Sequence, residues 1–196
     1  MAYQFLITLQ DVSSPKVWRR ILVPEKYNFE QLHIAIQSSF GWTNSHLYEF
    51  TAKELEYPIS EPAPDFPEQR CIPAYDFPMS EFFTKAGKSC SYEYDFGDGW
   101  LHSVKLEAVT PTNVHRARCI AGEGQCPPED CGGVPGYERL KKVMAAPRVE
   151  DEECYEEYEE MREWLDLGEG EVWNPVRFDL RETNDRLRWP GSDDED

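Results

Sequence analysis

Two stretches near the start of the chain alternate between apolar and polar residues. Residues 3–9 read Tyr-Gln-Phe-Leu-Ile-Thr-Leu, and the alternation resumes over residues 17–23 after turn-forming residues. A period of two is typical of a strand with one buried face, so the pattern predicts an N-terminal β-hairpin. Arg19 and Arg20 fall on opposite faces of its second strand. We expect both to form ion pairs on this acidic protein, and contact with an anion is the alternative.

Apolar residues at helical spacing follow the hairpin. Asn28 and Gln31 match the capping box that begins many helices. The apolar positions that recur every three or four residues are Phe29, Leu32, Ile36 and Phe40. Gly41 supplies the stop signal, so we predict a helix that ends there and a further strand over residues 46–51.

A second hairpin is predicted at the centre of the chain, over residues 92–102. Its turn is the segment 97–99, Gly-Asp-Gly, in which glycine supplies positive φ values. The residues that share one face of the incoming strand are Tyr92, Tyr94 and Phe96. Those that share one face of the outgoing strand are Trp100, His102, Val104 and Leu106. A tight turn would bring Asp95, Asp98 and His102 together at one end of this hairpin.

The remaining sequence divides into an insertion, two helices and a tail. Residues 58–80 are rich in proline and predict a surface loop, ordered or partly mobile. Apolar spacing predicts a helix over 135–146 and an amphipathic helix with an acidic solvent face within 150–171. Residues 188–196 form an acidic tail. We therefore predict a single-domain α+β roll over residues 1–187, with a mixed or largely antiparallel sheet whose two main hairpins are packed by helices.

The charge of the chain narrows the range of partners. Its 196 residues include 38 acidic and 20 basic side chains, for a net charge of −18. Such a surface repels phosphate, which disfavours nucleic acid and anionic membranes and leaves basic protein segments and divalent cations. The N-terminus lacks the positive region of a signal peptide, and no apolar run approaches the roughly 18 residues of a membrane helix. We expect a cytoplasmic protein whose six cysteines are reduced thiols or metal ligands.

A glycine- and proline-rich loop over residues 119–133 concentrates three cysteines. They are spaced as Cys119-x₆-Cys126-x₄-Cys131, wider than the common zinc knuckle. Zinc favours four thiolate or imidazole ligands, and the fourth ligand is left open among His102, His115 and Cys71. The candidate zinc set is Cys119, Cys126, Cys131 and His102. Unligated thiols and a Cys126–Cys131 disulfide are the alternatives.

Carboxylates stand at the turn of the central hairpin and near the end of the cysteine loop. The candidate catalytic residues are Asp95, Asp98, His102, Glu129 and Asp130. If the two motifs converge, the carboxylates could hold Mg²⁺ or Mn²⁺ with the histidine as general base, which suits hydrolysis of a phosphate ester. The alternative is structural: these side chains serve a turn, cap the following helix and bond to the backbone.

Several motifs, in their order along the chain, resemble one protein family. They are Val17-Trp18-Arg19-Arg20-Ile21, Phe40-Gly41-Trp42, His46-Leu47, the run from Tyr94 to His102, and the run from Cys126 to Gly133. Over about residues 3–187 the chain is similar to the Ri-plasmid ORF-three-like family, some members of which carry transposon-passenger or resolvase labels. The resemblance implies an α+β roll and no established activity. A serine recombinase needs an activated serine among arginines and a basic DNA-binding arm, so the resolvase label does not suit this acidic chain.

Two functions from different classes are consistent with these residues. The first is a non-catalytic interaction module that uses the 92–102 hairpin and the 119–133 loop to bind a protein or basic peptide. Aromatic residues rimmed by carboxylates favour it. The second is a metal-dependent hydrolase, phosphoesterase- or nuclease-like, which only the resemblance links to mobile elements. Zinc is the first cofactor to expect, followed by magnesium or manganese.

Overall fold

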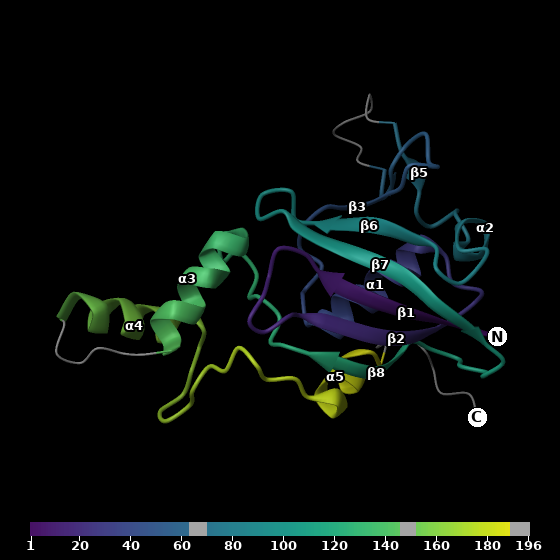
Figure 1. Cartoon of the computed structure of the whole chain (residues 1–196). Coiled ribbons are helices and arrows are strands. Elements are labelled where there is room, and N and C mark those ends of the chain that lie inside the picture. The colour runs from purple at the N-terminus through teal and green to yellow at the C-terminus, as the bar shows by residue number, and fades with distance from the viewer. Residues whose placement is uncertain (63–69, 146–151, 189–196) are drawn as a thin grey trace.

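A curved β-sheet forms the centre of the molecule (Figure 1). The computed structural model describes residues 1–62, 70–145 and 152–188. Within these ranges eight strands form one sheet in the order β5-β4-β3-β6-β7-β1-β2-β8, antiparallel throughout except for the parallel pair β4–β5. The strands are β1 (Ala2–Leu9), β2 (Trp18–Pro24), β3 (Tyr48–Thr51), β4 (Ile59–Ser60), β5 (Ile72–Pro73), β6 (Ser89–Tyr94), β7 (Trp100–Thr110) and β8 (Arg118–Glu123).

The predicted N-terminal hairpin lies between β7 and the edge strand β8. Strand β1 pairs with β2 on one side and with β7 on the other, so that Phe5 lies opposite both Ile21 and Leu106. All three of these side chains are fully buried. The alternation of apolar and polar residues thus becomes an alternation of buried and partly exposed positions, as the sequence predicts.

Helix α1 (Phe29–Phe40) covers one face of the sheet (Figure 1). Its predicted capping box is confirmed: Gln31 N donates to Asn28 Oδ1 at 2.8 Å, and Asn28 N donates to Gln31 Oε1 at 3.1 Å. Gly41 ends the helix with φ of 98°, a left-handed conformation that suits glycine. The predicted apolar face of α1 is buried against the sheet; it consists of Phe29, Leu32, Ile36 and Phe40.

The two neighbouring arginines of β2 have different surroundings. Arg20 forms the expected ion pair, with its Nε 2.6 Å from Glu107 Oε2. Arg19 has no ion pair with any described carboxylate, so that prediction was wrong for it. Its guanidinium is buried and donates to backbone carbonyls, among them Ser39 O at 3.0 Å and Gly124 O at 3.0 Å. Arg19 therefore ties β2 to the end of α1 and to the segment after β8.

The proline-rich stretch 58–80 adds structure to one edge of the sheet. Its described residues include β4, β5 and the start of the short helix α2 (Met79–Phe82). Ile72 N donates to Pro58 O at 2.8 Å, which draws the stretch together at this edge. Residues 63–69 lie outside the described ranges.

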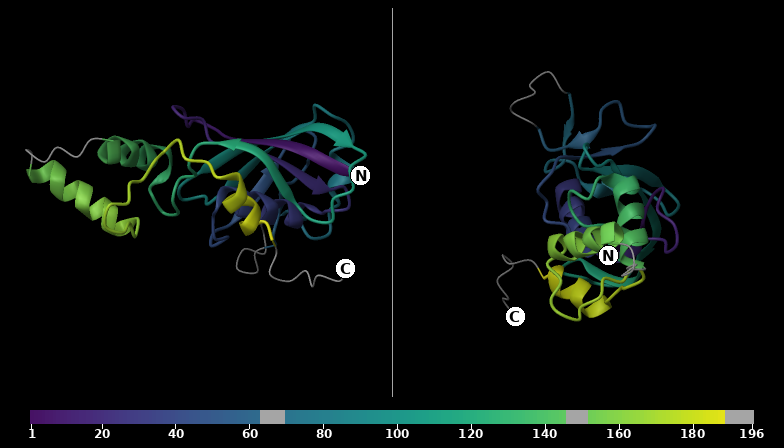
Figure 2. Two further views of the ribbon diagram at one scale, coloured as in Figure 1. Left: turned by 90° about the horizontal axis from the view of Figure 1, so that it is seen from below. Right: turned by 90° about the vertical axis from the view of Figure 1, so that its left-hand side faces the viewer.

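Two helices project beyond the end of the sheet at which the β6–β7 loop lies. Helices α3 (Gly133–Ala145) and α4 (Glu152–Trp164) form this projection, which Figure 1 and the left view of Figure 2 show. The chain then returns to the sheet, where α5 (Leu180–Arg186) lies beside β8 and α1. Asn184 fixes α5 there, because its Oδ1 accepts a hydrogen bond from Cys119 N at 3.0 Å. The acidic helix predicted within 150–171 corresponds to α4, which ends at Trp164.

The fold class predicted from the sequence is confirmed as a single α+β domain with a mixed sheet. Five helices accompany the sheet in the part of the chain that the structure describes. None of the helices described is both long enough and apolar enough to cross a bilayer. Most of the predicted acidic tail, residues 189–196, lies outside the described ranges.

Candidate functional site

The loop between β6 and β7 is longer than the predicted three-residue turn. It spans residues 95–99 and is closed by a hydrogen bond from Gly99 N to Asp95 O at 2.6 Å. Asp95 and Gly99 both have positive φ, 56° and 68°, which aspartate tolerates better than most residues. Strand β6 therefore ends at Tyr94. Phe96 lies in the loop with 46% of its surface exposed, so its predicted place on the strand face shared by Tyr92 and Tyr94 was wrong.

The end of the cysteine loop lies directly against this hairpin loop. Gly132 N donates to Asp98 Oδ2 at 3.2 Å. Gly133 has φ of 66°, and a Cβ atom there would lie only 2.5 Å from Asp98 O. Glycine lets the two backbones approach this closely. The two motifs singled out in the sequence therefore converge in space.

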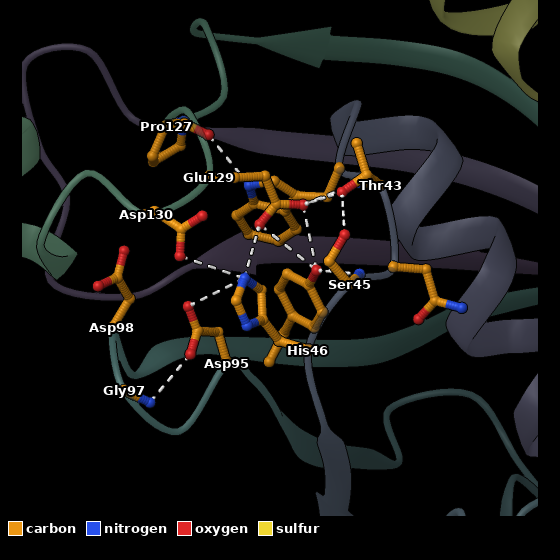
Figure 3. A network of polar contacts seen from close by, with 12 residues as sticks. Thr43, Ser45, His46, Asp95, Gly97, Asp98, Pro127, Glu129 and Asp130 are labelled. Atoms are coloured by element: carbon orange, nitrogen blue, oxygen red, sulfur yellow. Dashed lines mark hydrogen bonds and ion pairs between the residues drawn. The ribbon is translucent and has the colours of Figure 1, made fainter.

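His46 lies where the two loops meet (Figure 3). Its Nε2 atom faces three carboxylate oxygens: Asp130 Oδ1 at 3.4 Å, Asp95 Oδ2 at 3.8 Å and Glu129 Oε2 at 3.9 Å. The position of His46 follows from the strand pairing, because Asp95 N donates to Leu47 O at 2.9 Å just beyond the β3–β6 ladder. Strand register thus brings a histidine from one segment to an aspartate from another.

Two of these carboxylates are held by donors that leave one oxygen directed toward His46. Asp95 Oδ1 accepts from Gly97 N at 3.0 Å, and its Oδ2 is the oxygen nearer to the imidazole. Glu129 Oε1 accepts from Thr43 N at 2.8 Å, and its Oε2 is the oxygen nearer to the imidazole. The carboxylates are therefore oriented before any ligand arrives.

Tyr94 helps to hold the Glu129 carboxylate in place. Its hydroxyl donates to Glu129 Oε1 at 3.1 Å and accepts a hydrogen bond from Ser45 N at 3.1 Å. Burial, together with the charge of Glu129, raises the pKa of Tyr94 above its ordinary value. The phenol therefore stays protonated and acts as a neutral donor to the carboxylate.

The distances around His46 Nε2 fit a shared cation better than direct hydrogen bonds. This nitrogen is buried and has no hydrogen-bond partner among the described residues. Metal bonds of about 2.0–2.2 Å at tetrahedral angles place ligand atoms roughly 3.3–3.6 Å apart. Ligand atoms of His46, Asp95 and Asp130 lie within 4.8 Å of one another, the one such group found in the described ranges. A small inward movement of the side chains would close the group on an ion.

The site also gathers negative charge that no described lysine or arginine neutralises. Asp95 and Glu129 are largely buried, whereas the side chain of Asp130 is 73% exposed. Within residues 1–62, 70–145 and 152–188, no lysine or arginine nitrogen comes within 4.0 Å of these three carboxylates. Neighbouring carboxylates repel one another unless a proton or a cation lies between them. The arrangement therefore favours a cation that enters past Asp130.

The structure does not bring His102 to this cluster. His102 is fully buried in β7, and its Nδ1 lies 3.3 Å from Tyr92 O. Its ring meets the rings of Phe40 and Trp42 edge to face. Burial lowers the pKa of His102 to about 3, so the imidazole is neutral near pH 7. The geometry supports the backbone-bonded alternative for His102 over a role as general base or zinc ligand.

Acid should destabilise the fold through His102. Its pKa is about 3 when folded and about 6.5 when unfolded, so the unfolded chain binds the proton more readily between these values. The stability that neutral His102 contributes is complete above pH 6.5 and is lost as the pH falls toward 3. Urea unfolding between pH 7 and pH 4 should show a smaller acid loss for His102→Gln than for the natural chain. The exposed His115, changed to Gln, should leave the loss unaltered, and equal pH slopes for all three proteins would contradict this account.

The three cysteines of the loop do not gather around one point. Cys119 is buried in β8 and Cys126 is buried in the segment that follows, whereas Cys131 is half-buried beside the hairpin loop. Among the described residues, no three ligand atoms of these cysteines and His102 lie within 4.8 Å of one another. Cys126 and Cys131 are not joined by a disulfide. Burial raises the pKa of Cys126, and burial together with Asp98 raises that of Cys131 to about 12, which keeps both thiols protonated.

The other candidates for a fourth zinc ligand lie elsewhere. Cys71 stands next to β5, at the opposite edge of the sheet from β8 and its Cys119. His115 is exposed in the loop before β8, where it lines a recess with Met1 and Glu25.

His46 is the functional candidate that sequence reasoning missed. It was assigned to a strand with Tyr48 and Phe50, although β3 begins two residues later. One signal was available: His46-Leu47 is itself one of the motifs that carry the family resemblance. Nothing in the spacing of residue 46 from residues 95 and 129 indicates contact, because strand pairing brings them together.

Comparison with known proteins finds relatives that are themselves without an assigned function. The family model for the plasmid pRiA4b ORF-3-like protein matches residues 1–182. The uncharacterized protein y4hQ of Sinorhizobium fredii (strain NBRC 101917 / NGR234) is 36% identical over 161 residues, which are 81% of this chain and 77% of that protein. The crystal structure of MM3350, a protein of unknown function from Methanosarcina mazei Go1, is similar with a TM-score of 0.75 and 32% identity. That match covers 92% of this chain and 95% of MM3350.

These relatives extend the likeness from short motifs to nearly the whole sequence. The family model covers the sheet, the converged loops and the projecting helices alike. On this evidence the chain belongs to the family of plasmid pRiA4b ORF-3-like proteins.

Proposed function

We propose that this protein binds a divalent metal ion at the mouth of the β6–β7 hairpin, through His46, Asp95, Glu129 and Asp130. The observation that carries the proposal is His46 Nε2, a buried nitrogen that has no hydrogen-bond partner among the described residues and faces carboxylate oxygens at 3.4, 3.8 and 3.9 Å. The lack of any lysine or arginine nitrogen within 4.0 Å of these carboxylates, among the described residues, adds an electrostatic demand for a cation.

The donor set indicates the class of metal. One imidazole nitrogen with carboxylate oxygens suits Zn²⁺ or Mn²⁺, whereas Mg²⁺ prefers oxygen ligands and retains its water. The proposed site therefore uses most of the carboxylates predicted for Mg²⁺ or Mn²⁺, with His46 in place of His102. It uses none of the cysteines predicted for zinc.

Binding is the first candidate role for the site. A cation there would join three segments, residues 43–46, the 95–99 loop and the end of the cysteine loop, into one rigid surface. This is the surface that the sequence predicts for an interaction module. A lysine side chain of a basic peptide is the competing occupant, because its ammonium group can donate to the same carboxylates.

One observation favours a hydrolase as the second candidate. Asp130 is 73% exposed, so one side of the site faces solvent and leaves room for a water molecule on the metal. A bound divalent ion lowers the pKa of such a water toward neutrality and makes it a nucleophile. A panel of phosphomonoester and phosphodiester substrates, assayed with Mn²⁺ and Zn²⁺, separates this candidate from a purely binding role.

The proposal is tested by titrating metal into chelator-treated protein. We expect one Zn²⁺ or Mn²⁺ per chain by calorimetry, with much weaker binding of Mg²⁺. Because the ion binds only the folded chain, metal at a hundred times its Kd should add about 2.7 kcal/mol to the free energy of unfolding. No heat and no stabilisation from any of the three ions at 1 mM, roughly the weakest Kd of interest, would overturn the proposal. If a lysine-rich peptide binds the site and none of the three metal ions does, the site belongs to the peptide instead.

A further inference from the structure

The projecting helix α4 is the part of the molecule whose surface the fold uses least. None of its residues is fully buried, whereas α1 buries eight and α3 buries four. Helices of this length are marginal in water unless a face of them packs against something. Its large side chains stay partly in solvent: Tyr155 is 40% exposed and Trp164 is 50% exposed. Helix α4 therefore offers a face that the rest of the chain covers only in part.

Helix α4 is strongly acidic. The helix, Glu-Glu-Cys-Tyr-Glu-Glu-Tyr-Glu-Glu-Met-Arg-Glu-Trp, contains seven glutamates and one arginine. One glutamate, Glu157, is paired with Arg139 of α3 at 2.6 Å. The exposed glutamates have no lysine or arginine partner within 4.0 Å in the described part of the chain; they are Glu152, Glu153, Glu156, Glu159, Glu160 and Glu163.

Two recesses adjoin this face and have different chemistry. One, of about 280 Å³, lies between α3 and α4. It is lined by the apolar side chains of Leu140, Met161 and Trp164 and by charged ones that include Asp130 and Arg139. The other, of about 530 Å³, is lined by acidic residues that include Glu156 and Glu163. Glu160 borders both recesses, so they are neighbours on α4. A ligand that spans them would place an apolar side chain in the first and cationic side chains in the second.

We propose that α4 and the α3–α4 recess form a docking site for a basic, amphipathic segment of a partner protein. This surface adjoins the metal site, because Asp130 also lines the α3–α4 recess, but no residue of α4 belongs to that site and the proposal does not require a bound metal. Charge complementarity selects the partner: lysine or arginine side chains would meet the unpaired glutamates, and one large apolar residue would pack against Trp164 and Met161. A second copy of this chain would bring glutamates against glutamates, and nucleic acid or an anionic membrane would be repelled in the same way.

The test uses synthetic peptides and two charge-matched variants. The probe is a blocked 15-residue peptide with leucine and lysine at helical spacing, compared with a scrambled peptide of the same composition. In the first variant Glu156, Glu159 and Glu163 become Lys. In the control variant three exposed glutamates outside the projection, Glu54, Glu56 and Glu61, become Lys, which changes the net charge equally. A third variant is Trp164→Ala.

Binding is measured by fluorescence anisotropy at physiological salt. We expect micromolar binding of the amphipathic peptide, about tenfold weakening in the first variant and in Trp164→Ala, and little change in the control variant. The scrambled peptide should bind about tenfold more weakly than the amphipathic one. Equal weakening in the two charge variants would show general electrostatic attraction and overturn the proposal. Unchanged binding by Trp164→Ala, or a dimer that forms through α4 in sedimentation, would also overturn it.

Discussion

Replacing His46 by alanine should weaken Zn²⁺ or Mn²⁺ binding by about a hundredfold or more. Loss of an outer partner of a metal ligand commonly costs about 10–100-fold, and His46 would itself be a ligand. Asp95→Asn should have a comparable effect, because its Oδ2 is directed at the same point while Oδ1 is held by Gly97 N. Tyr94→Phe, which removes a donor to Glu129, should cost about tenfold. Calorimetric titration of each variant measures these ratios.

Asp98 is the matched control for this series. It lies in the same loop as Asp95, but its Oδ2 accepts from Gly132 N. Asp98→Asn keeps a hydrogen-bond acceptor and should bind metal as well as the natural chain. Metal binding that survives His46→Ala and is lost when Cys119, Cys126 and Cys131 are changed to serine would contradict the proposed site. That result would favour the cysteine-based zinc site that the sequence predicts.

Replacing Arg19 by leucine should destabilise the fold by about 3–5 kcal/mol. The Arg19 guanidinium is 3% exposed and donates to four backbone carbonyls, those of Trp18, Ser39, Glu123 and Gly124, at 2.8–3.0 Å. Leucine would leave these oxygens without their donor in a buried setting, where each unsatisfied group costs about 1–3 kcal/mol before the structure relaxes. The change would also remove the cation–π contacts with Phe40 and Phe178. Urea unfolding at pH 7 measures the loss.

Arg20 provides the comparison on the same strand. Its side chain is partly exposed and pairs with Glu107, an arrangement that contributes about 1 kcal/mol or less. Arg20→Leu should therefore cost much less than Arg19→Leu. Arg19→Lys should fall between them, because lysine keeps the charge but lacks the planar fork that serves several carbonyls at once. Equal losses for Arg19→Leu and Arg20→Leu would mean that the buried hydrogen bonds do not matter as argued.

Local rules made much of the fold predictable from the sequence. Period-two alternation identified β1 and β2, and the Asn28–Gln31 capping box with Gly41 set both ends of α1. These features depend on interactions between residues that are neighbours in the chain, so they can be predicted from the sequence alone. The limits appear where local signals are weak. Strand β6 ends at Tyr94 because Asp95 adopts positive φ, and β4 and β5 form within a proline-rich stretch.

The candidate site likewise combines features that the sequence predicts with features that only strand pairing sets. The sequence alone identified Asp95, Asp98, Glu129 and Asp130 as chemistry-bearing residues, and the two motifs that carry them meet in the fold. It assigned the histidine role to His102, because that residue follows the hairpin turn closely. Strand pairing decided otherwise. The register that places Tyr92 opposite His102 buries that ring in the core, and the β3–β6 pairing carries His46 to Asp95.

Composition and short-range pattern thus determined the fold class, the family likeness and the acidic character of the chain. Only the tertiary structure decided which histidine faces the carboxylates, that Arg19 serves backbone carbonyls, and that the loop cysteines stay apart. The contacts of His46 and Arg19 join segments separated by about twenty residues or more, so their geometry depends on strand register. At the site it depends also on residues with positive φ, namely Asp95, Gly99 and Gly133. The cysteines stay apart because Cys119 is buried in β8 whereas Cys131 lies beside the hairpin loop.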